Sequence, residues 1–287
     1  MNIEIPKQPV HTPLLATGIL NKRDFLSGEV VLIGAGPGDP ELLTLKAYRL
    51  LKEADCVIYD RLVSDEIMAM VSEKAEKIYV GKKQSAHTLD QADINQLLID
   101  KARSGRKVAR LKGGDPFIFG RGGEEVQDLL AAGVACRVVP GVTAASACTT
   151  YSGIPLTHRD YVHGCTFITG HLQDGPGGQQ LSLPWQMLAR EDHTLVVYMG
   201  IKTAGIISRE LRKHGLPGST PVGLIRHGTT ENHQTFRTNI NNLGDFIAEH
   251  SIKPPTLIVI GKVVNALQDD INAADHAELQ WQQRQAM

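Results

Sequence analysis

Three glycine-rich segments are placed to hold a ligand, because each directly follows a short apolar run typical of a buried parallel strand. They are residues 34–39, 113–122 and 141–146. Glycine lets the main chain approach a ligand closely, and open α/β sheets bind ligands at the carboxyl ends of their strands. The second segment also carries Asp115 and Arg121, and the glycines around both charges favour a ligand site. The structural alternative is a set of strand-to-helix turns, with Asp115 as a helix cap and Arg121 as a solvated side chain.

The first segment departs from the fingerprint of a dinucleotide-binding protein. Its glycines follow the spacing G-x-G-x-G instead of G-x-G-x-x-G, and Pro37 lacks the N–H that a phosphate cradle would use. The acidic residue that binds a ribose in such proteins would have to be Asp60. A nicotinamide-dependent oxidoreductase is therefore kept as an alternative hypothesis.

Alternating strand and helix patterns position these segments. Apolar runs predict five strands in the first half of the chain, at residues 30–33, 56–59, 77–80, 108–111 and 136–139. Helical spacing of apolar residues covers 42–51 and 124–132, and Thr88 with Gln91 has the spacing of a capping box before a further helix. This alternation indicates crossover units on a parallel sheet.

A second set of elements follows near residue 141. Strands are predicted at residues 166–169, 195–199, 221–225 and 257–260, helices at 143–149 and 203–214, and a surface loop at 174–178. We therefore predict a flexible leader over 1–27, an N-terminal α/β domain over 28–141, a C-terminal α/β domain over 142–267 and a polar tail over 268–287.

Composition argues against several classes of protein. The 287 residues carry 30 Lys+Arg against 31 Asp+Glu, so no global field attracts nucleic acid or an anionic membrane. The apolar stretches are strand-sized and no secretory signal precedes them. The four cysteines lack any Cys-x-x-Cys pair, which favours reduced, mostly buried thiols and no metal site. We expect a soluble, cytoplasmic protein that binds a small molecule.

Segments matching in order along residues 28–265 resemble the uroporphyrinogen-III C-methyltransferases. The matching segments are residues 34–40, 59–63, 80–82, 111–121, 140–145, 153–159, 169–171, 198–200 and 254–257. The segment 111–121 is particularly specific, because related precorrin methylases, diphthine synthase and ribosomal-RNA ribose methyltransferases of the same fold look different there.

The resemblance implies the two-domain tetrapyrrole methylase fold of class III methyltransferases, with α/β domains, parallel and mixed sheets and an active-site cleft between the domains. It also implies a homodimer. The residues that it implies for contact with S-adenosylmethionine, whose product is S-adenosylhomocysteine, are Pro37, Gly113, Gly114, Asp115, Ile118, Thr143, Ala144, Met199 and Gly228. A pocket of main-chain polar atoms with apolar walls suits a cationic sulfonium and a flat adenine.

The implied reaction is C-methylation of uroporphyrinogen III at two pyrrole carbons, C-2 and C-7, to give precorrin-2 for siroheme, cobalamin or heme d1 synthesis. The sulfonium already activates the methyl group, so no metal is expected. By resemblance Asp60 is the proton acceptor, Lys82 the proton donor, and Arg121 with Glu124 a pair that orients substrate and takes part in catalysis. An arginine is a poor proton shuttle because its pKa is above about 12, so we favour an orienting role for Arg121.

The substrate is ringed by carboxylates, which cationic side chains can bind. Candidate partners for these carboxylates are Arg61, Lys82, Lys83, Lys112 and Arg159, each of which is equally consistent with an ordinary surface charge. The resemblance also implies Met199, with Arg121 and Glu124, at the substrate. We interpret His158 and His171, in matching segments, as hydrogen-bonded structural histidines.

Some features depart from the family pattern or bear on its limits. Arg226 and His227 before Gly228, and Lys202 after residues 199–201, are more basic than expected, which leaves the affinity for the cofactor open. No dehydrogenase/ferrochelatase domain is expected before residue 28, so the activity is expected to stop at methylation. A third hypothesis, methylation of RNA, is disfavoured by the balanced charge and the 5% aromatic content.

Overall fold

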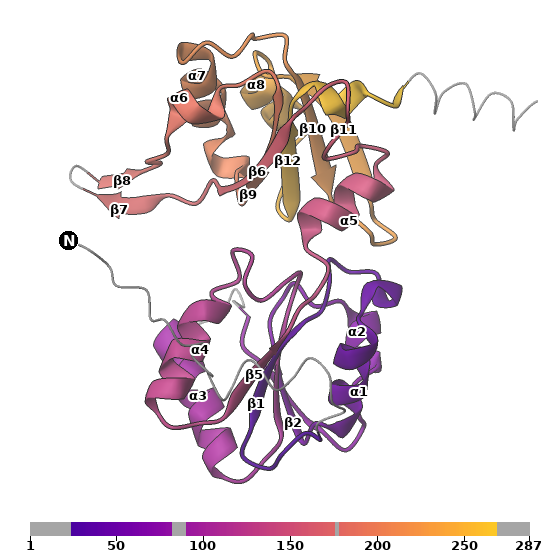
Figure 1. Ribbon diagram of the computed structural model, residues 1–287, viewed down its shortest axis with the longest axis vertical. Helices are drawn as coiled ribbons and strands as arrows, with labels where there is room; N and C mark the ends of the chain where they lie inside the picture. Colours follow the sequence, from indigo (N-terminus) through magenta and orange to yellow (C-terminus); the bar gives the residue numbers. More distant parts are fainter. Residues whose placement is uncertain (1–23, 82–89, 176–177, 269–287) are drawn as a thin grey trace, which may run out of the picture. The chain divides into compact units, whose positions relative to one another are not determined.

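Residues 24–81, 90–175 and 178–268 are described in the computed structural model of the chain (Figure 1). The chain divides between Val142 and Thr143 into two compact units, and each contains a five-stranded sheet. None of the helices in these ranges has the length and apolar character that a membrane span requires.

The sheet of the first unit is entirely parallel, as the alternating pattern predicted. Its strands are β1 (Val30–Gly34), β2 (Cys56–Tyr59), β3 (Glu76–Tyr79), β4 (Val108–Lys112) and β5 (Cys136–Val139). Their spatial order is β3-β2-β4-β1-β5. All five carboxyl ends therefore lie at one edge of the sheet, where the glycine-rich segments begin.

Helices cover both faces of this sheet (Figure 1). The helices are α1 (Leu45–Glu53), α2 (Asp65–Ala69), α3 (Gln91–Arg103) and α4 (Gly122–Ala131), and a 3-10 turn spans Pro40–Leu42. Apolar residues of α1 and α2 pack in one core cluster, and those of α3 and α4 pack in another. The helix after β4 thus lies on one face, whereas the helices after its neighbours β1 and β2 lie on the other. Connections that diverge in this way open a crevice at the carboxyl ends, which is where such sheets bind ligands.

Two sequence-based predictions in the first unit are wrong in detail. Helix α3 is capped by Asp90 in a reciprocal capping box with Asp93, so Gln91 is its first residue and not its third. Thr88 lies outside the described residues. The leader predicted over residues 1–27 also extends too far, because Phe25 is 1% exposed and belongs to the core beside α1.

The sheet of the second unit is mixed. Its strands are β6 (Gly164–Thr169), β9 (His193–Tyr198), β10 (Pro221–Arg226), β11 (Gln234–Asn239) and β12 (Thr256–Ile260), in the order β11-β10-β12-β9-β6. Only the β6–β9 pair among these is parallel. The predicted strand set lacked β11, since this edge strand is mostly polar and shows no apolar run.

Helices also pack on both faces of the second sheet. They are α5 (Ala144–Tyr151), α6 (Trp185–Leu188), α7 (Ala204–Lys213) and α8 (Leu243–Glu249), with 3-10 turns at Ile201–Thr203 and Lys262–Asn265. One core cluster gathers α6, α7 and α8, and the other gathers α5 with Val263 and Val264. The surface loop predicted at 174–178 is wrong in part, because β7 (Gln173–Gly175) and β8 (Gly178–Gln180) pair as a short hairpin there.

All four cysteines are free thiols, as their spacing predicted. Cys56, Cys136 and Cys148 are buried. Burial raises the pKa of the Cys136 and Cys148 thiols to about 12, so both stay protonated and unreactive near neutral pH.

The ends of β1, β4 and β5 press against one another through glycines. A Cβ atom on Gly34 would collide with the main chain of Gly141, and one on Gly141 would collide with the carbonyl oxygen of Gly114. Backbone in this arrangement has no room to yield, because each turn is held by the strand before it. Glycine is required here by close approach of the main chains.

Gly141→Ala is expected to lower the free energy of unfolding by roughly 1–3 kcal/mol, because the added methyl group meets main-chain atoms that cannot move aside. Gly123→Ala is the matched control, since its Cβ would face open space at the start of α4. That change should be neutral or add up to about 1 kcal/mol. Urea unfolding of both variants checks the expectation, and equal shifts in the two would contradict it.

Candidate active site

Hydrogen bonds lock the glycine turns together at the carboxyl edge of the first sheet. Gly114 donates its N–H to the carbonyl of Gly36 at 2.6 Å, and Gly36 donates in return at 3.1 Å. The carboxylate of Asp115 accepts from the N–H of Gly141 at 3.0 Å and from that of Phe117 at 2.8 Å. Asp115 therefore joins two turns and does not cap a helix, because α4 follows Arg121 without a side-chain cap; the alternative interpretation of Asp115 as a helix cap is wrong.

The turn after β4 presents large side chains to solvent. Phe117 and Phe119 are exposed there, and so is Leu62 on the turn after β2. Phe119 and Arg121 have φ angles of 51° and 60°, in the left-handed region that non-glycine residues rarely adopt. Such backbone persists only where the surrounding structure enforces it, and it is concentrated at functional sites.

Arg121 and Glu124 form a two-pronged ion pair at the start of α4. Arg121 donates from Nε to Oε1 of Glu124 at 3.0 Å and from Nη2 to Oε2 at 2.7 Å, and both side chains are about half exposed. The hydrogen bonds raise the pKa of Arg121 and lower that of Glu124. A guanidinium made still harder to deprotonate cannot accept a proton at neutral pH, which agrees with the orienting role favoured from the sequence.

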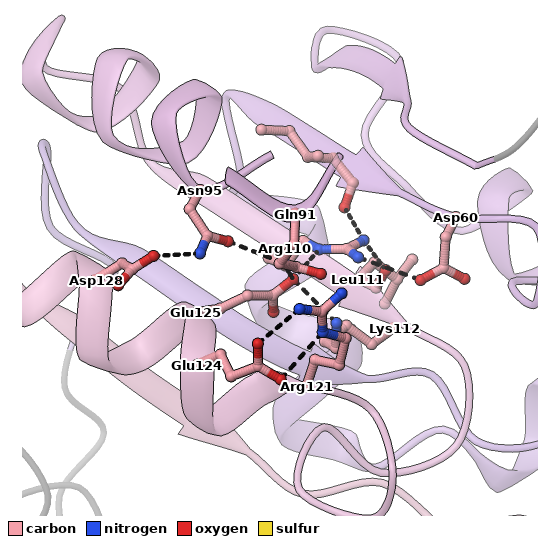
Figure 2. A network of polar contacts seen from close by, with 11 residues as sticks. Asp60, Gln91, Asn95, Arg110, Leu111, Lys112, Arg121, Glu124, Glu125 and Asp128 are labelled. Atoms are coloured by element: carbon pink, nitrogen blue, oxygen red, sulfur yellow. Dashed lines mark hydrogen bonds and ion pairs between the residues drawn. The ribbon is translucent and has the colours of Figure 1, made fainter. Parts of the chain in front are cut away.

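Asp60 directly follows β2 and belongs to a network of mostly buried polar groups (Figure 2). Its Oδ1 accepts from the N–H of Leu62 at 3.1 Å, and its Oδ2 lies 3.3 Å from Nη2 of Arg110. The side chain of Asp60 is 27% exposed. Asp60 therefore has one side toward solvent and the other toward a buried cation.

Lys112 belongs to the same network and not to the surface. It is 4% exposed, and its ammonium donates to Oε1 of Glu125 at 3.0 Å. Burial lowers the pKa of Lys112, and the neighbouring Arg110 lowers it further. Both interpretations of Lys112, a partner for a substrate carboxylate and a surface charge, are corrected by this burial. Arg61 and Arg159 are exposed, whereas Lys82 and Lys83 lie outside the described residues.

The candidate residues of the second unit lie at the start of α5 and after two strands. The hydroxyls of Thr143 and Tyr198 lie 2.6 Å apart, and Tyr198 accepts from the N–H of Ala145 at 2.9 Å. Burial raises the pKa of the Tyr198 hydroxyl, which therefore stays protonated at neutral pH. Met199 follows directly, half exposed and with a φ of 55°.

Gly228 lies in a strained turn between β10 and β11. A Cβ on Gly228 would collide with the sulfur of Cys148 in α5, and the flanking His227 and Thr229 have φ angles of 47° and 68°. His233 accepts from the N–H of Thr229 at its Nδ1, 3.1 Å away. The turn is thus held from both sides.

His233 was missed from the sequence, although it fixes this turn through a local polar cluster. Its Nε2 lies 3.1 Å from the hydroxyl of Ser152 and 2.9 Å from that of Thr235. Since Nδ1 accepts a hydrogen bond, the ring is neutral with its proton on Nε2. Burial lowers the pKa of His233, which favours the same form.

The two histidines interpreted as structural differ in the structure. His158 accepts at Nδ1 from the N–H of Asp160 at 3.2 Å and packs against the ring of Tyr161, 4.7 Å away, so the interpretation is confirmed for it. His171 is exposed, and its ring makes no hydrogen bond within the described ranges. The interpretation is therefore wrong for His171.

Arg110 and Glu125 are the other functional candidates that sequence reasoning missed. Both are buried, although they carry charges. A usable signal existed, because Arg110 interrupts an apolar run and a charge in a buried strand requires a partner. Glu125 lies four residues before Leu129, on the buried face of α4. No three His, Cys, Asp or Glu side chains of the described parts are grouped as metal ligands.

The family model of the tetrapyrrole (corrin/porphyrin) methylases matches residues 29–244. Among curated proteins, a siroheme synthase of Ruthia magnifica subsp. Calyptogena magnifica is 52% identical over 248 residues, which cover 86% of this chain and 52% of that protein. A siroheme synthase of Pseudomonas fluorescens is 52% identical over 240 residues, 84% of this chain and 51% of that protein. The chain thus spans about half the length of these curated relatives.

Solved structures match over more of their own length. The uroporphyrin-III C-methyltransferase of Thermus thermophilus, complexed with S-adenosylhomocysteine, is 42% identical with a TM-score of 0.70, covering 83% of this chain and 94% of that one. A cobalt precorrin-4 methyltransferase is 27% identical with a TM-score of 0.71, covering 83% of this chain and 96% of that one. The fold is thus that of the class III methyltransferases, with one parallel and one mixed sheet.

Acidification is expected to weaken the fold through His233. The pKa of His233 is lowered in the folded state. The stability that the neutral ring contributes is therefore fully present above the pKa of the unfolded chain, about 6.5, and is lost as pH falls through the lower pKa of the folded protein. His233→Gln keeps an acceptor and donors but does not titrate. Urea unfolding near pH 8 and near pH 5.5 should show a smaller loss in this variant than in the wild type.

The exposed His171→Gln serves as the control and should lose as much stability as the wild type on acidification. If the free energy of unfolding depended on pH identically in all three proteins, the neutral form of His233 would not be what stabilises the fold.

Proposed function

Because the chain belongs to the tetrapyrrole (corrin/porphyrin) methylase family, we propose that it methylates uroporphyrinogen III at C-2 and C-7 with S-adenosylmethionine, giving precorrin-2. The observation that carries the proposal is the grouping at the carboxyl edge of the first sheet. Exposed Leu62, Phe117 and Phe119 offer apolar contact to the pyrrole rings of a macrocycle, and Arg121 lies on the same turn as the two phenylalanines. The oxidoreductase and RNA hypotheses gain no support from the similar proteins.

The turns present fit S-adenosylmethionine better than a nucleotide phosphate. Residues 113–115 are half-buried and lie beside the crowded glycines, and Pro37 removes one N–H from the neighbouring turn. Main-chain dipoles of both signs suit a ligand that carries a sulfonium, a carboxylate and an ammonium. The residues that we propose to hold it are Pro37, Gly113, Gly114, Asp115 and Ile118 in the first unit, and Thr143, Ala144, Met199 and Gly228 in the second. When bound, S-adenosylmethionine supplies an electrophilic methyl group.

Asp60 is the proposed proton acceptor. Its carboxylate is the partly exposed end of a buried ionic network, so it can reach a ligand while Arg110 holds it in place. There it takes the proton that an enamine-like pyrrole releases when its carbon gains the methyl group. Lys82 is kept as the proposed proton donor on the family resemblance alone.

Arg121, with Glu124, is proposed to orient the substrate. A guanidinium fork binds a carboxylate through two parallel hydrogen bonds, as it already binds Glu124. A substrate carboxylate would share or replace that partner. Arg61, Arg159 and Met199 are proposed as further substrate contacts.

The assembly and location of the protein are proposals of the same kind. We propose a cytoplasmic homodimer, supported by the free thiols and by the family resemblance. Light scattering would separate a 31.2 kDa protomer from a particle of twice that mass. The name of the curated relatives favours siroheme synthesis as the consumer of precorrin-2, with cobalamin and heme d1 synthesis as alternatives.

Purified protein incubated without oxygen with uroporphyrinogen III and methyl-labelled S-adenosylmethionine should place two labelled methyl groups on each tetrapyrrole. Mass spectrometry of the extracted product checks the number and position. Labelled S-adenosylmethionine left unconsumed, with uroporphyrinogen III as the sole tetrapyrrole, would overturn the proposed function.

Arg121→Lys is expected to lower kcat/KM at least 10-fold, because an ammonium cannot reproduce the two-pronged contact. Binding of S-adenosylmethionine by calorimetry should change little. The control is Arg190→Lys, because Arg190 makes the same two-pronged contact with Asp192 at 3.0 and 2.8 Å and is as exposed. Equal activity in the two variants would remove Arg121 from the mechanism.

A further inference from the structure

We infer that Arg110 is a positioning residue, which fixes the carboxylate of Asp60 and is itself held by the buried Glu125. The inference rests on the proposed function, in which Asp60 accepts a proton. It places two buried residues, Arg110 and Glu125, behind the candidate site.

The guanidinium of Arg110 is anchored on three sides before it reaches Asp60. Its Nε donates to Oε1 of Glu125 at 3.0 Å, and its Nη1 donates to the carbonyls of Leu111 at 3.1 Å and Ile58 at 3.4 Å. The remaining Nη2 donates to Oδ2 of Asp60 at 3.3 Å. A planar group held in this way has little freedom, so the position of Nη2 restricts where the Asp60 carboxylate can lie.

Glu125 in α4 is the centre of the network, and Figure 2 shows side chains of β4 and α3 converging on it. Its Oε1 accepts from Arg110 and Lys112 in β4 and, at 3.2 Å, from Nε2 of Gln91 in α3. Gln91 continues to Asn95 at 2.9 Å, and Asn95 donates to Asp128 in α4 at 2.5 Å. One buried carboxylate thus ties α3 and α4 to the strand that carries Arg110.

Charge explains why Asp60 belongs to this network. Arg110 and Lys112 bring two positive charges into the interior, where Glu125 supplies one negative charge. Asp60 provides the second negative charge within reach of Arg110, and of these four groups it alone is more than marginally exposed. A buried charge without a partner is strongly unfavourable, so the network favours a carboxylate at this place on the edge of the sheet.

The arrangement differs from a buried ion pair that serves the fold alone. Arg137 in β5 makes a two-pronged pair with Glu29, at 2.7 and 2.9 Å, before the start of β1. That pair lies toward the amino ends of the strands, away from the candidate site. The network of Arg110 instead lies near the carboxyl ends and includes a group that reaches the surface.

The test compares Arg110→Met with Arg137→Met, since both remove a buried guanidinium from a buried glutamate. If Arg110 acts through Asp60, Arg110→Met should lower kcat about 10- to 100-fold and leave the affinity for S-adenosylmethionine by calorimetry within about 2-fold. Arg137→Met should lose stability without this loss of kcat.

A double-mutant cycle separates positioning from a general structural effect. In an Asp60→Asn background, adding Arg110→Met should lower kcat by less than about 2-fold, because the group that it positions is already disabled. Should Arg110→Met fail to fold, Arg110→Lys supplies the readout, since it keeps the charge but not the fork. It should lose part of kcat and leave the affinity for S-adenosylmethionine near the wild-type value.

The outcomes distinguish the inference from the proposed function. A wild-type protein that leaves uroporphyrinogen III unmethylated overturns both. Two outcomes with an active wild type overturn the positioning role alone. In one, the Arg110 variants behave like Arg137→Met. In the other, Arg110→Met lowers kcat by the same factor in the Asp60→Asn background as in the wild type.

Discussion

Two positive charges inside the first unit are the constraint around which its carboxyl edge is organised. The side chains of Arg110 and Lys112 extend from β4 toward α4, where Glu125 accepts a hydrogen bond from each. Buried ions are tolerated only when hydrogen-bonded partners replace water, so the helix, the strand and the end of β2 must keep a fixed relation. The same carboxylate therefore fixes the position of Glu124, which precedes Glu125 in α4 and binds Arg121 just before the helix.

Glycine turns complement this ionic constraint from the other side of β4. The ends of β1, β4 and β5 approach so closely that main chain meets main chain, and Asp115 ties two of the turns through its carboxylate. Side chains larger than hydrogen are excluded there by contact and not by conformation alone, because Gly34 and Gly141 do not have positive φ angles. The edge is consequently closely packed at its glycines, whereas Phe117 and Phe119 are exposed beside them.

The sequence predicted what short-range patterns encode and missed what depends on long-range contacts. Apolar residues located every strand of the first sheet, most clearly β1, which is buried throughout and is apolar from Val30 to Ile33. The polar edge strand β11 has no such run. The capping box was assigned two residues too early because Thr88 and Asp90 are both good caps, and spacing does not choose between them. Arg110 and Glu125 lie 15 residues apart, so their pairing required the fold.

Strained backbone at the candidate residues suggests how the site is kept ready for a ligand. Arg121 precedes α4, Met199 follows β9 and His227 follows β10, all with left-handed φ angles. Each such residue costs roughly 1–2 kcal/mol relative to ordinary backbone, so neighbouring contacts must impose it. Two of these residues have such contacts. The side chain of Arg121 donates to Glu124, and the N–H of His227 donates to the carbonyl of Pro255. Side chains whose backbone is already held in place lose less freedom when a ligand arrives.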